Sequence, residues 1–185
     1  MTTIATPKIQ ASTASEICER FNLPKEARAL LKEGMNPREF ADALLAKKQY
    51  VTGIDFLSHA LPPREGIWWG CLCLQSAVGD EIEPSDKEAA TAAVRWVLAP
   101  AEEHRAAARP PAEAIGLKTA AGALAAAVTQ TGFSNGQPKP APFAPAKTVA
   151  LAVKLATIKG EPSRILDRQK ACVELALEIA AGRHM

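Results

Sequence analysis

The sequence is poor in aromatic residues and has no long apolar run. Only 5% of its 185 residues are aromatic, whereas alanine makes up roughly one residue in five. Alanine favours helices, and strands usually need branched or aromatic side chains. The longest apolar stretch, residues 120–128, is much shorter than the ~20 residues of a membrane-spanning helix. The composition therefore favours an all-α protein without such a helix, and a chain of this length suits one domain.

A concentration of charge is also lacking. The chain has 22 basic and 20 acidic residues, a net charge of +2, and no block of five or six like charges. Nucleic-acid binding needs a concentrated basic face. The N-terminus lacks the basic segment and apolar run of a signal peptide. We therefore expect a cytoplasmic protein whose partner is neither a nucleic acid nor a membrane.

Motifs for metal binding and catalysis are absent as well. Cys71 and Cys73 are spaced so that on a helix their side chains point about 200° apart. Neither His59 nor His104 follows a glutamate by three residues, as a di-iron helical bundle requires. No His-Glu-x-x-His, Gly-x-Ser-x-Gly or glycine-rich phosphate loop occurs. We predict no metal, no cofactor and no catalytic residue.

The four cysteines are Cys18, Cys71, Cys73 and Cys172. Their spacing does not suit a disulfide framework, and a reducing compartment keeps such residues as thiols. We interpret them as small core side chains. A small enzyme that uses His59, Glu65 and either Cys71 or Cys73 is the alternative, although apolar surroundings raise a thiol pKa and make the thiol inert.

Prolines, glycines and capping residues divide the chain into about nine to ten mostly antiparallel helices, because short connections join antiparallel neighbours. We predict an irregular multi-helix domain over residues 12–181, preceded by a flexible tail at 1–11. Within the helix expected at 63–78, residues 67–74 are apolar on every side, which is typical of a central buried helix. The helices are expected near residues 12–21, 24–34, 37–47, 51–60, 63–78, 84–98, 100–109, 110–128, 146–159 and 162–181.

Two adjacent tryptophans follow a double proline at the start of the expected central helix. Arg64 lies one turn before Trp68, where its guanidinium can stack on the indole. Glu65 lies one turn before Trp69 and can accept its indole N–H. One interpretation is simply the start of the core helix. The other is a pocket for a protein partner, because tryptophan and arginine are favoured binding residues.

Residues 132–145 contain four prolines and two glycines, which predicts an extended segment rather than a helix. Phe133 and Phe143 lie at the two ends of this segment. Their rings either pack on their own domain or dock on another protein, as preformed extended segments do. The candidate partner-binding residues are therefore Arg64, Glu65, Trp68, Trp69, Phe133 and Phe143.

Residues 56–73 read Phe-Leu-x-His-Ala-Leu-Pro-x-Arg-Glu-x-x-Trp-Trp-x-Cys-Leu-Cys, and residues 20–31 read Arg-Phe-x-Leu-Pro-x-Glu-Ala-Arg-x-Leu-Leu. With these phrases the chain resembles a family of small bacterial proteins of unknown function, in which alanine takes the place of Gly66. The resemblance implies an association with type VI secretion loci, which also encode tip proteins and effector-loading chaperones.

Three functional hypotheses follow. The favoured one is a non-enzymatic accessory factor, an adaptor or co-chaperone for effector loading in type VI secretion. Its partner would be an effector, a chaperone or a secretion-tip component. The second is an immunity protein that neutralises a cognate toxin from the same kind of locus. The third is the small enzyme with His59, Glu65 and Cys71.

Overall fold

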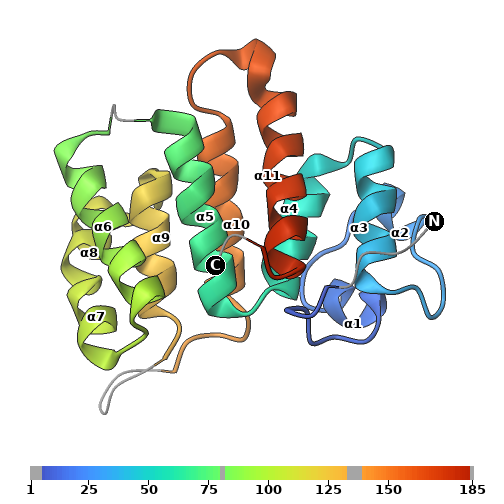
Figure 1. The fold of residues 1–185 in the computed structure, drawn as a ribbon, viewed down its shortest axis with the longest axis horizontal. Helices are drawn as coiled ribbons and strands as arrows, with labels where there is room; N and C mark the ends of the chain where they lie inside the picture. Colours follow the sequence, from blue (N-terminus) through green and yellow to red (C-terminus); the bar gives the residue numbers. More distant parts are fainter. Residues whose placement is uncertain (1–5, 80–81, 133–138, 184–185) are drawn as a thin grey trace.

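The computed structural model describes residues 6–79, 82–132 and 139–183. Every regular element within these ranges is a helix, which confirms the predicted all-α fold (Figure 1). The α-helices are α1 (Ala14–Cys18), α2 (Lys25–Arg28), α3 (Pro37–Ala46), α4 (Tyr50–Ala60), α5 (Pro63–Val78), α6 (Pro84–Leu98), α7 (Glu102–Ala107), α8 (Arg109–Ile115), α9 (Ala120–Thr129), α10 (Ala144–Thr157) and α11 (Ile165–Ala180). Two short 3-10 turns, η1 (Gly116–Lys118) and η2 (Pro162–Arg164), precede α9 and α11.

Helices α5 and α10 form the centre of the molecule. Helix α10 contacts α4, α5, α9 and α11, and α5 contacts α6, α9, α10 and α11. Helices α6–α9 lie on one side of this centre, and α1–α4 lie on the other (Figure 1). The all-round apolar sequence of α5 explains its place, since Ile67 and Trp69 are completely buried.

Small residues allow the central helices to approach closely. A Cβ atom on Gly70 of α5 would lie 2.4 Å from the Cδ2 atom of Leu124 on α9. The face of α9 toward the core consists largely of alanines with no exposed surface. The alanine-rich composition therefore serves tight packing between helices as well as helix formation.

Side-chain caps fix two of the predicted helix starts. Thr13 and Glu16 form a capping box at α1, and Asn36 and Glu39 form another at α3. In each, a side-chain oxygen accepts a hydrogen bond from the backbone N–H three residues later, and the glutamate accepts the return bond. These signals are local, which is why the sequence reveals them.

One long predicted helix is wrong. The stretch predicted as a single helix over residues 110–128 is divided into α8 and α9 by η1. Gly116 takes a positive φ of 66°, and the Thr119 hydroxyl accepts a hydrogen bond from the Gly122 N–H to cap α9. A glycine in the left-handed region followed by a threonine cap ends one helix and begins the next.

The boundaries of the two non-helical segments also differ from the prediction. Within the tail predicted at residues 1–11, the Lys8 N–H donates to the Ala180 carbonyl at 3.1 Å, and Ile9 packs against the core. The extended segment predicted at 132–145 gives way to α10 at Ala144, two residues early. Pro145 fits this first turn because the N–H it lacks would have no partner there.

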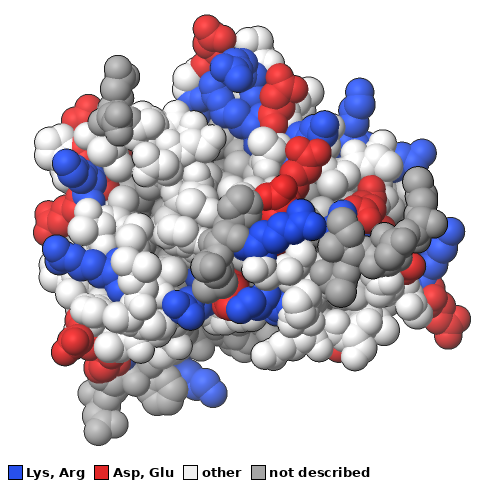
Figure 2. Space-filling view, in the orientation of Figure 1, with Lys and Arg blue, Asp and Glu red and all other residues white. Residues whose placement is uncertain are grey.

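Basic and acidic residues are interspersed over the face shown in Figure 2. Within the described ranges, no helix is both long and apolar enough to cross a membrane.

Candidate functional site

Trp69 belongs to the core and not to a surface. It has no exposed area, and its indole N–H donates to the backbone carbonyl of Cys172 on α11 at 2.8 Å. The predicted hydrogen bond from Trp69 to Glu65 is therefore wrong, because the indole points across to the neighbouring helix. As a partner-binding residue Trp69 is unsuitable unless the core opens.

The residues around Trp69 have contacts within the chain. The Arg64 Nε–H donates to the Val97 carbonyl at 2.7 Å and so joins the start of α5 to the end of α6. The Glu65 carboxylate is buried and lies 3.3 Å from the Lys8 ammonium group. Trp68 is half-buried and packs against the core. Of these predicted binding residues, Arg64 remains largely exposed.

Phe143 is different, because a large apolar side chain here remains on the surface. It is 44% exposed, and its φ of 58° lies in the left-handed region. The Arg20 guanidinium lies 5.5 Å from the ring centroid, and the His59 ring lies 6.2 Å away. Phe143 thus packs partly on its own domain. Phe133, the other predicted aromatic, lies outside the described residues.

Phe143 stands at a pocket of about 380 Å³ between the start of α10, the junction of α4 and α5, and the chain at residues 10–11. We call it the His59 pocket. Leu61, Pro62, Pro63, Pro145 and Val149 supply apolar walls, and Gln10, Arg20, Ser58 and His59 supply polar groups. The double proline that follows α4 turns the chain directly into α5, which places Pro62 and Pro63 in the lining of the pocket.

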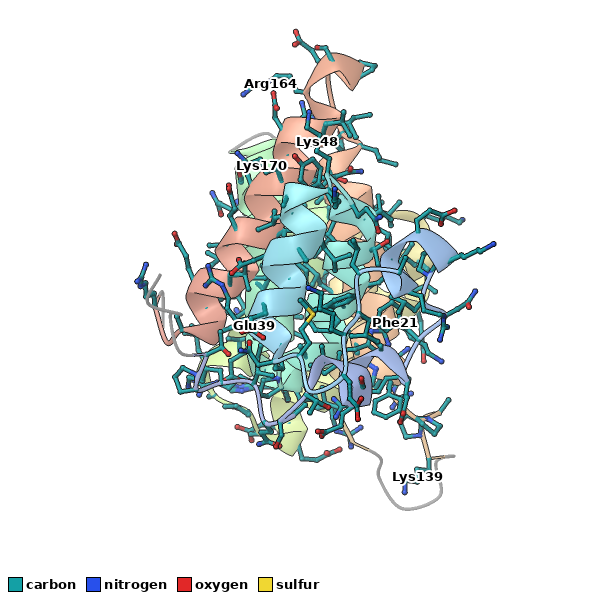
Figure 3. All side chains as sticks on the ribbon, turned by 90° about the vertical axis from the view of Figure 1, so that its right-hand side faces the viewer. Phe21, Glu39, Lys48, Lys139, Arg164 and Lys170 are labelled. Atoms are coloured by element: carbon teal, nitrogen blue, oxygen red, sulfur yellow. The ribbon has the colours of Figure 1, made fainter. Side chains whose placement is uncertain are left out.

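His59 supplies the polar centre of the pocket. Its Nδ1 atom lies 2.8 Å from the Asp55 carbonyl on the preceding turn of α4. A carbonyl only accepts, so Nδ1 carries the proton and Nε2 is left as an acceptor in the neutral ring. Nε2 is buried and has no hydrogen-bond partner within the described residues. The ring also stacks on Phe21, at a centroid distance of 5.2 Å; Figure 3 labels Phe21.

The surroundings keep His59 neutral. Burial lowers the pKa of His59 most, the backbone and charge of Asp55 oppose this, and the nearby cations Lys147 and Arg20 lower it further. Arg20 also fixes the site, since its Nη1 donates to the His59 carbonyl at 2.8 Å. The pocket therefore offers a guest apolar contact, and behind its surface lies one neutral hydrogen-bond acceptor, the buried Nε2 atom of His59.

Sequence reasoning identified Phe143 but did not connect it to His59 or Arg20. Arg20 begins the phrase at residues 20–31, and His59 lies within the phrase at residues 56–73. The presence of Arg20 and His59 in these two phrases was the sequence signal that could have linked them to one site. The three residues are too far apart in the chain for helical spacing to bring them together.

The residues of the alternative enzyme site are dispersed. Cys71 lines a separate pocket between α5 and α6, and burial raises the pKa of its thiol to about 12. Glu65 pairs with Lys8, whereas His59 lines the His59 pocket. In the part of the chain that the structure describes, no three His, Cys, Asp or Glu side chains are grouped so as to hold a metal ion.

A family model described as a family of unknown function (DUF6931) matches residues 40–180, which include α4, α5 and α10. No curated protein matches the chain, and no solved structure matches it.

Proposed function

The chain belongs to the family of unknown function DUF6931, and from this premise we propose that it is a non-enzymatic accessory factor that binds another protein at the His59 pocket. The observation that carries the proposal is the state of Phe143. A bulky residue in the left-handed region costs on the order of 1–3 kcal/mol, and such strain concentrates at binding and catalytic sites. Here the strained residue also leaves 44% of an aromatic side chain in solvent.

The chemistry of the pocket indicates the kind of group that it takes. Phe143 and the proline walls suit a flat apolar body, and His59 Nε2 lacks a donor within the described residues. Tyrosine and tryptophan combine an apolar body with a hydrogen-bond donor at the tip. We propose that the partner inserts such a side chain. Because Nε2 is buried in the unbound chain, insertion requires the neighbouring rings to shift.

We propose further that the partner belongs to a type VI secretion apparatus, as an effector, a chaperone or a tip component, and that this chain is an adaptor or co-chaperone for effector loading. The support is the resemblance of residues 20–31 and 56–73 to the bacterial family phrases. The mixed surface charge in Figure 2 suits a protein partner better than a nucleic acid.

The test is co-purification of the tagged chain with each protein encoded beside its gene, expressed together one at a time. Stable capture of one neighbour supports the proposal, and failure to capture any neighbour refutes it. Co-expression with a neighbouring toxin tests the alternative hypothesis of an immunity protein. If the chain rescues growth from that toxin, it is an immunity protein, and the co-chaperone proposal is replaced.

Phe143→Ala is the informative variant in these assays, because its ring is exposed. Trp69→Ala tests folding instead, since its side chain is completely buried and bonded to α11. Loss of partner capture by Trp69→Ala would count only if the variant keeps the helical content of the original chain.

A further inference from the structure

Two thiols from different helices line one pocket that shares no residue with the His59 pocket. Cys73 on α5 and Cys172 on α11 both line a pocket of about 450 Å³, together with Arg164 and Arg168. Figure 3 shows Arg164 at the top, well separated from Phe21 beside the His59 pocket. The bond from Trp69 to the Cys172 carbonyl holds α11 against α5 at this level. Neither cysteine lines the His59 pocket.

Cys73 and Cys172 influence each other's ionisation. The Cys73 thiol lowers the pKa of Cys172, although burial acts in the opposite direction. Burial, with contributions from Cys172 and Cys71, raises the pKa of Cys73. Burial also raises the pKa of Cys18 to about 11 and that of Cys71 to about 12. Cys172 thus differs from the other three cysteines in the direction that favours a thiolate.

The position of Cys172 suits attack from the pocket. It is 8% exposed and lines the pocket, whose charged lining residues are two arginines and one aspartate, Asp167. Reactive cysteines are found in such electropositive, partly accessible places, whereas inert ones lie in apolar cores. Cys73, the neighbouring thiol, is placed to resolve an oxidised Cys172.

We propose that Cys73 and Cys172 form a redox-responsive pair that a hydroperoxide converts to a disulfide joining α5 to α11. The Cys172 thiolate attacks the terminal peroxide oxygen, the O–O bond breaks, and sulfenic acid forms with release of water or an alcohol. The Cys73 sulfur then attacks the Cys172 sulfur, the S–O bond breaks, and a second water leaves. Two thiols lose two electrons in total, which reduce the peroxide.

A pair of this kind agrees with a reducing compartment. Disulfides that form inside cells are usually transient and redox-sensing rather than structural. The pair is therefore a modification site distinct from the His59 pocket, and its oxidation restrains the C-terminal helix against the core. Arg168 already anchors the start of α11 through hydrogen bonds to the Thr157 and Lys159 carbonyls, so the disulfide would fasten the same helix at a second point.

The experiment is titration of the purified full-length chain with hydrogen peroxide, followed by alkylation and mass spectrometry. Cys71 and Cys73 lie in one tryptic peptide, residues 65–87, because no lysine or arginine separates them. The decisive measurement therefore uses Cys71→Ser, in which a link to the peptide at 171–183 identifies Cys73. We expect this linked peptide and a mass loss of two hydrogens.

Three further variants complete the test. In Cys73→Ser we expect a Cys172 sulfenic acid that dimedone traps, and in Cys172→Ser we expect no disulfide. Cys18→Ser is the matched control and keeps the link. The proposal is overturned if the Cys71→Ser chain forms no link at several equivalents of peroxide, or if the link joins Cys18 instead. Because the decisive result comes from Cys71→Ser, it holds even if Cys172→Ser does not fold.

Discussion

Lys48 and Phe143 are the non-glycine residues with positive φ in the described ranges, and they occupy that conformation for different reasons. Lys48 closes α3: its N–H donates to the Leu45 carbonyl, and the Gln49 N–H donates to the Leu44 carbonyl. This is the Schellman arrangement, which usually uses glycine. Phe143 instead begins α10 beside a pocket, where a glycine would remove the aromatic surface.

Lys48→Gly should stabilise the chain. Glycine removes the steric cost of the left-handed conformation, about 1–2 kcal/mol, and loses part of that gain, roughly 0.5–1 kcal/mol, to greater freedom in the unfolded state. We expect a net increase of about 0.5–1 kcal/mol in the free energy of unfolding, measured as a higher urea midpoint with an unchanged slope. A lower midpoint would mean that the Lys48 side chain makes a stabilising contact.

His59 should make stability depend on pH. Burial keeps its folded pKa below the ordinary value of 6.5, so the unfolded chain binds a proton more readily. The corresponding stability is present above 6.5 and is lost as the pH falls through the folded pKa.

Urea unfolding between about pH 7.5 and about pH 5 measures this dependence. The stability of His59→Gln should fall less over that range than that of the original chain. His104→Gln is the control, because the His104 ring bonds to the Ala99 carbonyl on the surface. The stability of this variant should fall with pH as that of the original chain does. Parallel curves for all three proteins would show that His59 is protonated as easily in the folded chain as in the unfolded one.

Two helical glycines differ in the space that their surroundings leave for a side chain. A Cβ atom on Gly122 of α9 would lie 2.4 Å from the Gly116 carbonyl oxygen, whereas one on Gly66 of α5 meets only Val149, at 4.0 Å. Gly122 therefore permits a close approach of two backbone segments. Gly66 occupies an ordinary helical position with room for a methyl group.

Gly122→Ala should lower the free energy of unfolding by about 1–3 kcal/mol, because backbone must move to make room. Gly66→Ala should raise it by about 0.5–1 kcal/mol through better helix propensity. Thermal or urea unfolding of the two variants, one the control for the other, checks both signs. Equal effects in the two variants would contradict the packing of η1 against α9.

Helices could be predicted where their signals are local. The caps at Thr13 and Asn36 and the prolines at 37, 63 and 84 fix their starts from neighbouring residues alone. The break at Gly116 was missed because alanine-rich flanks hide a single glycine. The contact of Trp69 with Cys172 spans 103 positions, so its direction depended on how α11 packs, which helical spacing does not reveal.

In the candidate site, too, local signals could be predicted from the sequence, whereas contacts between distant segments could not. Phe143 was identified because an aromatic at the end of a proline-rich segment is conspicuous by itself. His59 and Arg20 reach it only through packing of α4 and α10 with the segment after α1. Trp68 and Trp69 were conspicuous for the opposite reason, since adjacent indoles on a central helix mainly fill the core.

The two proposals concern separate regions: the His59 pocket, at which we propose that a partner binds, and the pocket that Cys73 and Cys172 line. The binding claim is the central one, and it predicts where a partner's free energy of binding is concentrated. Leu166 on α11 provides a matched comparison, because it is 62% exposed and lines neither pocket.

The most direct measurement is calorimetric titration of the co-purifying neighbour into the original chain, Phe143→Ser and Leu166→Ser. Both substitutions remove a large exposed apolar side chain. We expect Phe143→Ser to weaken binding by at least about tenfold, as loss of a central contact residue does, and Leu166→Ser to leave the affinity unchanged. An unchanged affinity for Phe143→Ser, or an equal loss in both variants, would contradict binding at the His59 pocket.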